Sequence, residues 1–173
     1  MNSRKSYQHF EHDNLSTTLS GSKNNWNHSL FDNSFNYNNQ YILDLSHTFL
    51  EDLSGLVDFP FLKALILNNC SLTNKAISTL PELHHLETLS LNKNELYDIS
   101  LTCEHIKSSC PNLRHLSLHL NPICPDELSE TFNLSYDYER YRNYCIRKIP
   151  TLAFLDSSPV TLKEKMYANN IIN

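Results

Sequence analysis

Leucine residues recur along the middle of the chain in a spacing that repeats itself. Between Leu86 and Leu96, leucines stand at positions 86, 89, 91 and 96, with Asn94 between the last two. Apolar residues at alternating positions predict a short strand with one buried face. The spacing recurs three more times, the last in a weaker form, at Leu62, Leu65, Leu67, Cys70 and Leu72; at Leu113, Leu116, Leu118, Asn121 and Ile123; and at Leu43, Leu45, Thr48 and Leu50.

The four copies of this spacing are in phase. Their second leucines, Leu43, Leu65, Leu89 and Leu116, are 22, 24 and 27 residues apart, which is the range of a leucine-rich repeat. One such repeat cannot bury its leucines alone, but stacked repeats bury a continuous column. We therefore predict an α/β leucine-rich repeat solenoid of about four repeats, with a parallel sheet on its concave side and a helical C-terminal cap.

The position after each predicted strand has a structural role of its own. An inward-pointing amide there can bond backbone groups that would otherwise be buried without partners. Asn94 and Asn121 supply that amide, whereas Cys70 offers only a weak thiol donor. These three residues are predicted to form a structural ladder through the solenoid.

The chain beyond the fourth repeat changes its pattern. Apolar residues at spacings of three and four predict an amphipathic helix from Asp137 to Lys148. Thr161 and Glu164 match a capping box, which begins a final short helix. We expect the repeat domain to span residues 39–173, with its C-terminal cap at about 137–173.

Residues 1–38 are polar and rich in asparagine. Such a segment cannot bury enough apolar surface to offset its ordering entropy, so we expect most of it to be disordered. Its aromatic residues, among them Trp26, Phe31 and Phe35, leave a second interpretation open. In that interpretation the segment covers the exposed edge of the first repeat, because solenoids need a cap at each end.

The charge, hydropathy and cysteine content of the chain argue against several classes of function. The net charge is −5 and the sequence pI is near 5.9, whereas nonspecific binding to nucleic acid needs a basic surface. No apolar run approaches the ~20 residues of a membrane span, and no secretory signal is recognisable. The five cysteines are scattered and odd in number, as expected of reduced thiols. We expect a cytoplasmic or nuclear protein that is monomeric when alone, without direct nucleic-acid contact or membrane insertion.

An enzyme or a metal site is the main alternative class. Histidines and cysteines supply suitable residue types, namely His84, His85, His115, His119, Cys103, Cys110 and Cys124. On one strand face, however, His115 and His119 would lie about 13 Å apart at ~3.3 Å per residue. Ligands of one zinc ion lie ~2.0–2.3 Å from it. We therefore predict no catalytic residue, no metal ligand and no cofactor.

Several motifs together resemble an intracellular leucine-rich repeat family with a C-terminal cap. They are Leu43-Asp44-Leu45-Ser46, Leu89 to Asn94, Leu116 to Leu118, the Cys124-Pro125 turn, and the stretch from Tyr141 through Pro150 to Val160-Thr161. The family includes the spliceosomal A-prime protein, and the resemblance is greatest to members associated with melanocyte differentiation. It implies a non-enzymatic adaptor in pigment-cell differentiation or organelle trafficking, with a Rab-type small GTPase as a candidate partner. The alternative is an assembly subunit of a nuclear ribonucleoprotein.

The partner surface follows from the strand alternation, because positions outside the leucine column face outward on the concave side. Three of them, Ile42, Ile66 and Leu120, are large aliphatic residues that the repeat does not require. Several exposed aliphatics among charged residues are typical of a protein interface. The residues predicted to bind a folded protein partner are Ile42, Asp44, Lys63, Ile66, Asn68, Glu87, Ser90, Asn92, Arg114, His115, Ser117, His119 and Leu120.

Overall fold

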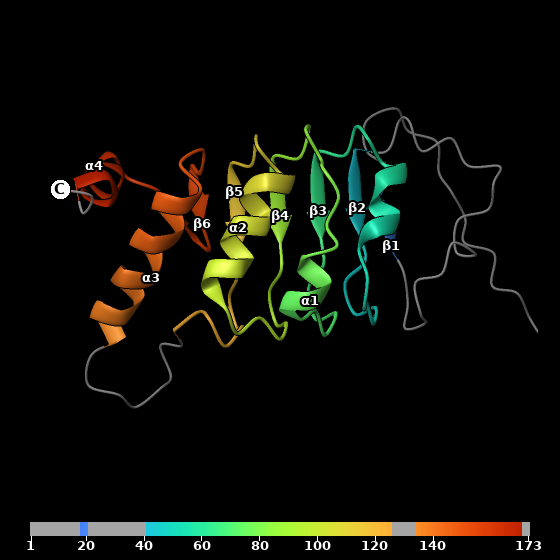
Figure 1. The fold of residues 1–173 in the computed structure, drawn as a ribbon, viewed down its shortest axis with the longest axis horizontal. Helices are drawn as coiled ribbons and strands as arrows, with labels where there is room; N and C mark the ends of the chain where they lie inside the picture. The colour runs from blue at the N-terminus through green and yellow to red at the C-terminus, as the bar shows by residue number, and fades with distance from the viewer. Residues whose placement is uncertain (1–17, 21–40, 126–133, 171–173) are drawn as a thin grey trace, which may run out of the picture.

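The computed structural model of the chain describes residues 18–20, 41–125 and 134–170. Its described strands form one sheet in chain order: β1 (Thr18–Ser20), β2 (Ile42–Asp44), β3 (Ala64–Ile66), β4 (Thr88–Ser90), β5 (His115–Ser117), β6 (Phe154–Leu155) and β7 (Ser158–Pro159). β1 to β6 are parallel, and β7 turns back antiparallel on β6. This sheet confirms the predicted α/β leucine-rich repeat solenoid (Figure 1).

The register of the sheet stacks the repeat leucines on one another. Leu43, Leu65, Leu89, Leu116 and Leu155 are consecutive partners across β2 to β6, and each is buried. Further leucines of the repeats join them in a single core cluster. Burial of a leucine side chain contributes about 1.5–3 kcal/mol, so this column is the main source of the solenoid's stability.

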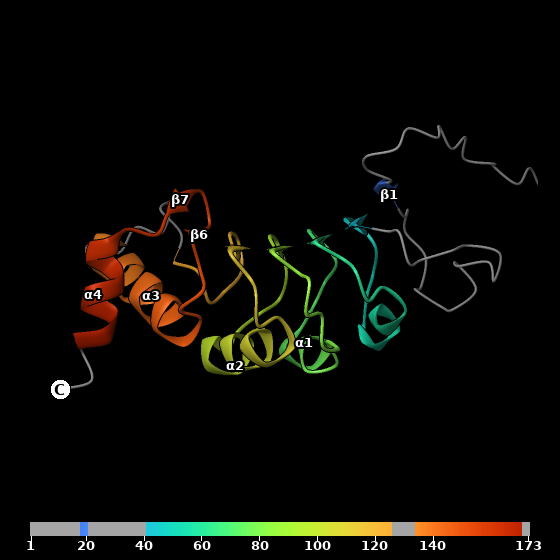
Figure 2. The same ribbon diagram turned by 90° about the horizontal axis from the view of Figure 1, so that it is seen from above.

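The segments between the strands return along the opposite side of the sheet (Figure 2). The first two are short helical turns, the 3-10 helix η3 (Ser54–Asp58) and α1 (Asn74–Ile77), and the third is a longer helix, α2 (Ile99–Ser109). The side chain of Asp98 accepts the N–H of Leu101 and so satisfies one free donor in the first turn of α2.

Strands β2 to β5 each lead into a turn with left-handed backbone geometry. His47, Asn69, Lys93 and Leu120 have φ angles of 64, 56, 58 and 58 degrees, each one position before the inward ladder residue. Residues other than glycine adopt this region at a cost unless the surrounding structure fixes them. The regular spacing of these four residues shows that the repeat geometry imposes the turn.

Asn94 bonds the backbone of two successive repeats. Its Oδ1 accepts the N–H groups of Cys70 and Leu72 at 2.9 and 3.1 Å. Its Nδ2 donates to the carbonyl groups of Leu67 and Leu91, both at 2.8 Å. A buried amide with these bonds satisfies backbone groups that water cannot reach.

Asn121 and Cys70 occupy the corresponding places in the neighbouring repeats. Asn121 donates to the carbonyls of Leu91 and Leu118 and accepts the N–H of Leu96. The Cys70 thiol donates to the Leu45 carbonyl with an Sγ–O distance of 3.2 Å, and burial raises the pKa of the thiol to about 11. At this position of the repeat, the Cys70 thiol is therefore only a weak hydrogen-bond donor, whereas the side-chain amides of Asn94 and Asn121 both donate and accept.

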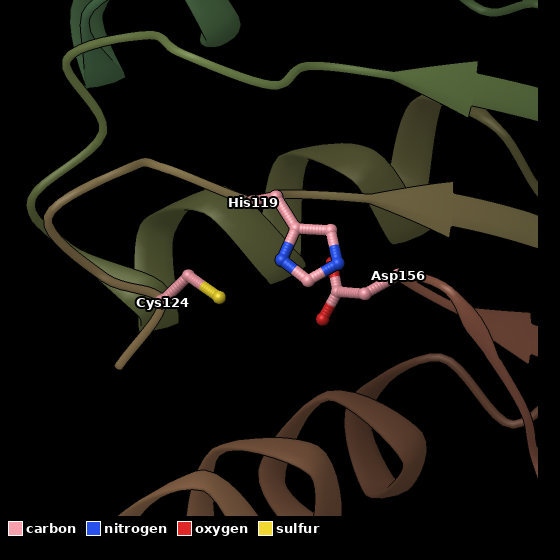
Figure 3. Close-up of side chains that lie close together, drawn as sticks. All are labelled: His119, Cys124 and Asp156. Atoms are coloured by element: carbon pink, nitrogen blue, oxygen red, sulfur yellow. The ribbon is translucent and has the colours of Figure 1, made fainter. Parts of the chain in front are cut away.

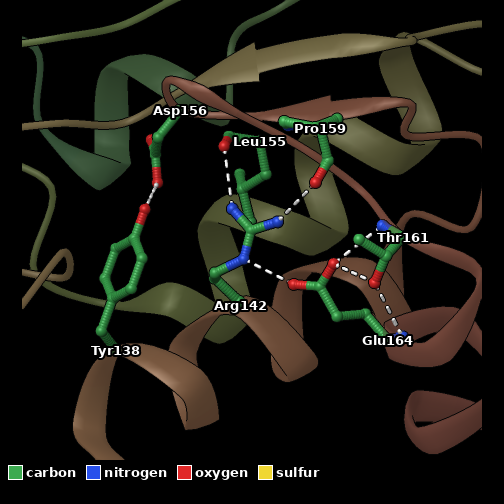
Figure 4. Close-up of polar contacts among 7 residues, drawn as sticks. All are labelled: Tyr138, Arg142, Leu155, Asp156, Pro159, Thr161 and Glu164. Atoms are coloured by element: carbon green, nitrogen blue, oxygen red, sulfur yellow. Dashed lines mark hydrogen bonds and ion pairs between the residues drawn. The ribbon is translucent and has the colours of Figure 1, made fainter. Parts of the chain in front are cut away.

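The C-terminal end of the core is covered by two helices, α3 (Leu134–Lys148) and α4 (Leu162–Asn170). Buried Arg142 of α3 donates from Nε to Glu164 of α4 at 2.7 Å, and to the carbonyl groups of Leu155 and Pro159 (Figure 4). Glu164 also accepts the N–H of Thr161, and Thr161 accepts the N–H of Glu164. These two reciprocal bonds are the capping box expected from the sequence.

The N-terminal extension contributes one described element. Thr18–Ser20 pairs with β2 as a parallel strand, with Leu19 opposite Leu43. Residues 1–17 and 21–40 lie outside the described residues, so both interpretations of that segment, disorder and an edge cover, remain predictions there. Among the described ranges, no helix has both the length and the apolar composition needed to cross a membrane.

Candidate functional site

The face of the sheet that points away from η3, α1 and α2 is called the sheet face below. It begins with a row of exposed residues just before the strands, Tyr41, Lys63, Glu87 and Arg114. The N–H of each of the last three donates to the carbonyl of the preceding member at 2.8–2.9 Å. The Lys63 ammonium also lies 5.8 Å from the centre of the Tyr41 ring. The row therefore presents an aromatic ring and charges of both signs along one edge.

The second row on the sheet face consists of the first residue of each strand from β2 to β6. These residues are paired with one another across the strands, and they are Ile42, Ala64, Thr88, His115 and Phe154. The first four are half-buried and Phe154 is exposed. His115 stacks on Phe154, with ring centres 5.1 Å apart and an interplanar angle of 19°. The row is mostly apolar, and it continues from the repeats onto the cap through Phe154.

A third row crosses the middle of the sheet face through Asp44, Ile66, Ser90 and Ser117, all half-buried. Its serines are held by the asparagines that follow the strands. Ser90 donates to Asn68 at 2.8 Å, and Ser117 donates to Asn92 at 2.7 Å. Asn68, Ser90, Asn92 and Ser117 thus form a chain of hydrogen bonds that fixes these side chains within the surface.

His119 and Leu120 stand where the fourth repeat leaves β5. Leu120 is 55% exposed, whereas His119 is half-buried. The strand ends at Ser117, so His119 lies in a turn and not on the strand face that the sequence argument assumed. His119 and His115 therefore do not share one strand face, and His119 lies beside residues that are distant from it in the chain.

His119, Cys124 and Asp156 lie together at the junction of the fourth repeat and the cap. One ring nitrogen, the sulfur and one carboxylate oxygen all lie within 4.8 Å of one another, and Figure 3 shows the three side chains directed toward a common space. Asp156 also accepts the N–H of Leu118 and the hydroxyl of Tyr138, at 2.8 and 3.2 Å. Burial and the Asp156 carboxylate raise the pKa of Tyr138 to about 12.

Two further cysteines lie together inside the packed core. Cys103 of α2 and Cys145 of α3 have their sulfurs 3.9 Å apart, and both residues are fully buried. No disulfide forms among the five cysteines. The pKa of the Cys145 thiol is raised by the contact with Cys103 and by burial. A buried thiol with a raised pKa is inert, so Cys145 contributes packing.

The structure gathers most of the residues predicted to bind a partner on the sheet face. Of the thirteen predicted residues, Lys63, Glu87, Arg114 and Leu120 are exposed, and the other nine are half-buried. Sequence reasoning did not find two features of the face, the exposed ring of Phe154 and the position of Asp156 beside His119. Both residues come from the turn of the cap, whose place on the sheet depends on the packing of α3.

Comparisons with known proteins agree with the fold and with the resemblance predicted from the sequence. No family model matches the chain. It is 41% identical over 113 residues to the human Leucine-rich melanocyte differentiation-associated protein, covering 65% of this chain and 56% of that protein. It is 31% identical over 124 residues to U2 small nuclear ribonucleoprotein A' of Schizosaccharomyces pombe, covering 69% of this chain and 46% of that protein.

A solved structure is also similar, that of the Drosophila melanogaster SNF/U2A' complex. The matched chain is 26% identical, with a TM-score of 0.58, over 78% of this chain and 70% of that chain. This similarity supports the assigned fold and the resemblance to the A-prime proteins. The chain spans about half the length of the two curated relatives.

Proposed function

We propose that this protein is a non-enzymatic adaptor whose sheet face binds a folded protein partner. The main support is the composition of that face, where apolar side chains lie among charges of both signs. Ile42, Ile66 and Phe154 supply the apolar part, and the charged residues are Asp44, Lys63, Glu87 and Arg114. An apolar centre with a polar rim is the usual anatomy of a protein–protein interface.

The rigidity of the sheet face also favours binding. The hydrogen bonds among Asn68, Ser90, Asn92 and Ser117 hold four of its side chains in place before a partner arrives. A surface that is already ordered loses less conformational entropy on association. The proposal therefore does not need the face to rearrange.

The relatives suggest two kinds of partner. The resemblance to the melanocyte differentiation-associated protein favours an adaptor in pigment-cell differentiation or organelle trafficking, with a Rab-type small GTPase as one partner to test. The second candidate is assembly of a nuclear ribonucleoprotein, because the similar solved structure is a complex with SNF. The first candidate places the protein in the cytoplasm and the second in the nucleus.

Replacing Ile66 by lysine is expected to abolish capture of the natural partner by the full chain. Ile66 lies opposite Asp44 in the sheet, so a lysine there gains an acidic neighbour and the fold is retained. On binding, however, the lysine ammonium would lose its water and would replace the apolar contact that Ile66 supplies, a cost that the half-buried Asp44 carboxylate offsets only in part. Capture from cell extract followed by identification of the bound proteins measures the effect.

Leu101→Lys is the matched control, because Leu101 is an exposed leucine of α2, on the helix side of the solenoid. This variant should capture the same protein as the wild type. Purified Rab-type GTPase and purified SNF-type protein then separate the two candidate functions by direct titration. Equal capture by the wild type and by a folded Ile66→Lys variant would contradict binding at the sheet face.

A further inference from the structure

The His119–Cys124–Asp156 cluster is assembled from three separate parts of the chain. His119 follows β5, Cys124 lies in the turn that leaves the fourth repeat, and Asp156 follows β6 in the cap. Their donor atoms are a nitrogen, a sulfur and an oxygen within 4.8 Å of one another. Because they come from both sides of the junction, a ligand held by all three would join the last repeat to the cap (Figure 3).

We propose that His119, Cys124 and Asp156 bind a zinc ion. Zinc is of borderline softness and takes thiolate, imidazole and carboxylate ligands together. With bond lengths of ~2.0–2.3 Å, the donor atoms of a tetrahedral site lie about 3.3–3.8 Å apart. The three donor atoms lie within 4.8 Å of one another, so binding has to bring them together by up to about 1.0–1.5 Å. Three protein ligands leave the fourth position to a water molecule.

Asp156 is already oriented by neighbouring groups, as metal ligands usually are. The N–H of Leu118 donates to Oδ1 at 2.8 Å, and the hydroxyl of Tyr138 donates to Oδ2 at 3.2 Å. Each carboxylate oxygen has two lone pairs, so one on each oxygen is still available to an ion. The two bonds fix the carboxylate in the direction of His119 and Cys124.

Tyr141 supplies an independent indication of a polar occupant. Its side chain is 4% exposed, and its hydroxyl has no hydrogen-bond partner. Its ring centre lies 5.7 Å from that of Tyr138, whose hydroxyl donates to Asp156, so Tyr141 packs beside the cluster. A buried hydroxyl without a partner is costly, and a water bound to zinc offers it one.

The same three residue types also occur in cysteine nucleophiles, with histidine as the base and a carboxylate to orient it. Such a nucleophile must reach its substrate, whereas Cys124 is only 6% exposed. A buried sulfur can still ligate a metal ion that lies inside the junction with it. The geometry therefore favours an ion that stabilises the attachment of the cap.

The test uses the full chain after removal of metal with a chelator. Addition of zinc is expected to show one site of micromolar or tighter affinity and to raise the melting temperature by roughly 5–10 °C near saturation. Cobalt in place of zinc is expected to give a thiolate-to-cobalt absorption band in the near ultraviolet. The band should disappear in Cys124→Ala, and zinc affinity should fall more than about 100-fold in Cys124→Ala and His119→Gln.

The controls replace a thiol and an imidazole outside the cluster. Cys110 is buried beside α2 and His85 is exposed before β4, so Cys110→Ala and His85→Gln should bind zinc as the wild type does. If Cys124→Ala does not fold, His119→Gln still decides the question, because His119 is half-buried and outside the strands. Absence of zinc binding, a cobalt spectrum without the thiolate band, or unchanged affinity in His119→Gln overturns the proposal.

Discussion

Replacing Arg142 by methionine is expected to lower the free energy of unfolding by about 3–5 kcal/mol. Methionine fills much of the space of the arginine stem but leaves three acceptors without their donor, namely Glu164 and the carbonyls of Leu155 and Pro159. The Arg142 and Glu164 side chains are only 9% and 24% exposed, so water compensates little of this loss. Urea unfolding of the variant and the wild type measures the difference.

A double variant, Arg142→Met with Glu164→Gln, distinguishes two costs in the free energy of unfolding. One is that of the unpaired Glu164 carboxylate, and the other is that of the hydrogen bonds lost to the carbonyls of Leu155 and Pro159. The double variant should be more stable than the single variant, because it no longer leaves an unpaired carboxylate in the cap. A single variant within half a kilocalorie per mole of the wild type would show that the Arg142 network does not hold the cap.

The stability that the Arg142–Glu164 pair contributes is expected to depend on pH in a definite direction. Burial raises the pKa of Glu164, but the hydrogen bonds from Arg142 and Thr161 outweigh this effect, so the pKa lies below its ordinary value of 4.5. A carboxyl group with a lowered pKa in the folded state stabilises the protein above that value, and the contribution is lost as the pH falls below it. The difference between the wild type and Arg142→Met should therefore shrink on acidification.

Replacing Asn94 by leucine is expected to cost about 3 kcal/mol or more. The two side chains are similar in size, but leucine removes the acceptor for Cys70 and Leu72 and the donor for Leu67 and Leu91. Each buried backbone group left without a partner costs about 1–3 kcal/mol, partly offset by the gain in apolar burial. The melting temperature and the urea midpoint should both fall.

Asn112→Leu is the control for that variant. Asn112 is exposed and its amide makes a single bond, to the His84 carbonyl at 2.8 Å, so its replacement should change the stability by less than about 0.5 kcal/mol. Equal effects of the two substitutions would contradict the role assigned to the buried ladder.

The repeats and the capping box were predictable because their signals are local. The alternation around Leu89 sets the buried face of β4 within a few residues, and the four phased copies place every strand from β2 to β5. The bonds between Thr161 and Glu164 join residues only three positions apart. Such features depend on spacing in the chain and not on how distant parts pack.

The junction cluster was not predictable in the same way. Asp156 lies far along the chain from His119, and the two meet only because β6 pairs with β5. A strand pairing of this kind depends on the packing of the whole cap. His119 was also placed on a strand face, whereas the left-handed turn at Leu120 ends the strand before it.

The sequence of β1 also contains part of the repeat pattern. Thr18-Leu19-Ser20 is followed by Lys23-Asn24, in the same spacing as Thr88-Leu89-Ser90 followed by Lys93-Asn94. The fragment lies in a polar segment, and Ser16 stands where three of the repeats have their first leucine, namely Leu62, Leu86 and Leu113. The pairing of β1 with β2 follows the register of the complete repeats.

The most direct test of binding at the sheet face is site-specific photo-crosslinking in cells. A photoreactive residue is placed either at Glu87, exposed just before β4, or at Lys107, exposed on α2. Binding at the sheet face predicts a discrete cross-linked protein from position 87 and none from position 107. The same adduct from position 107, with none from position 87, would place the partner on the helices and contradict the proposed function of the sheet.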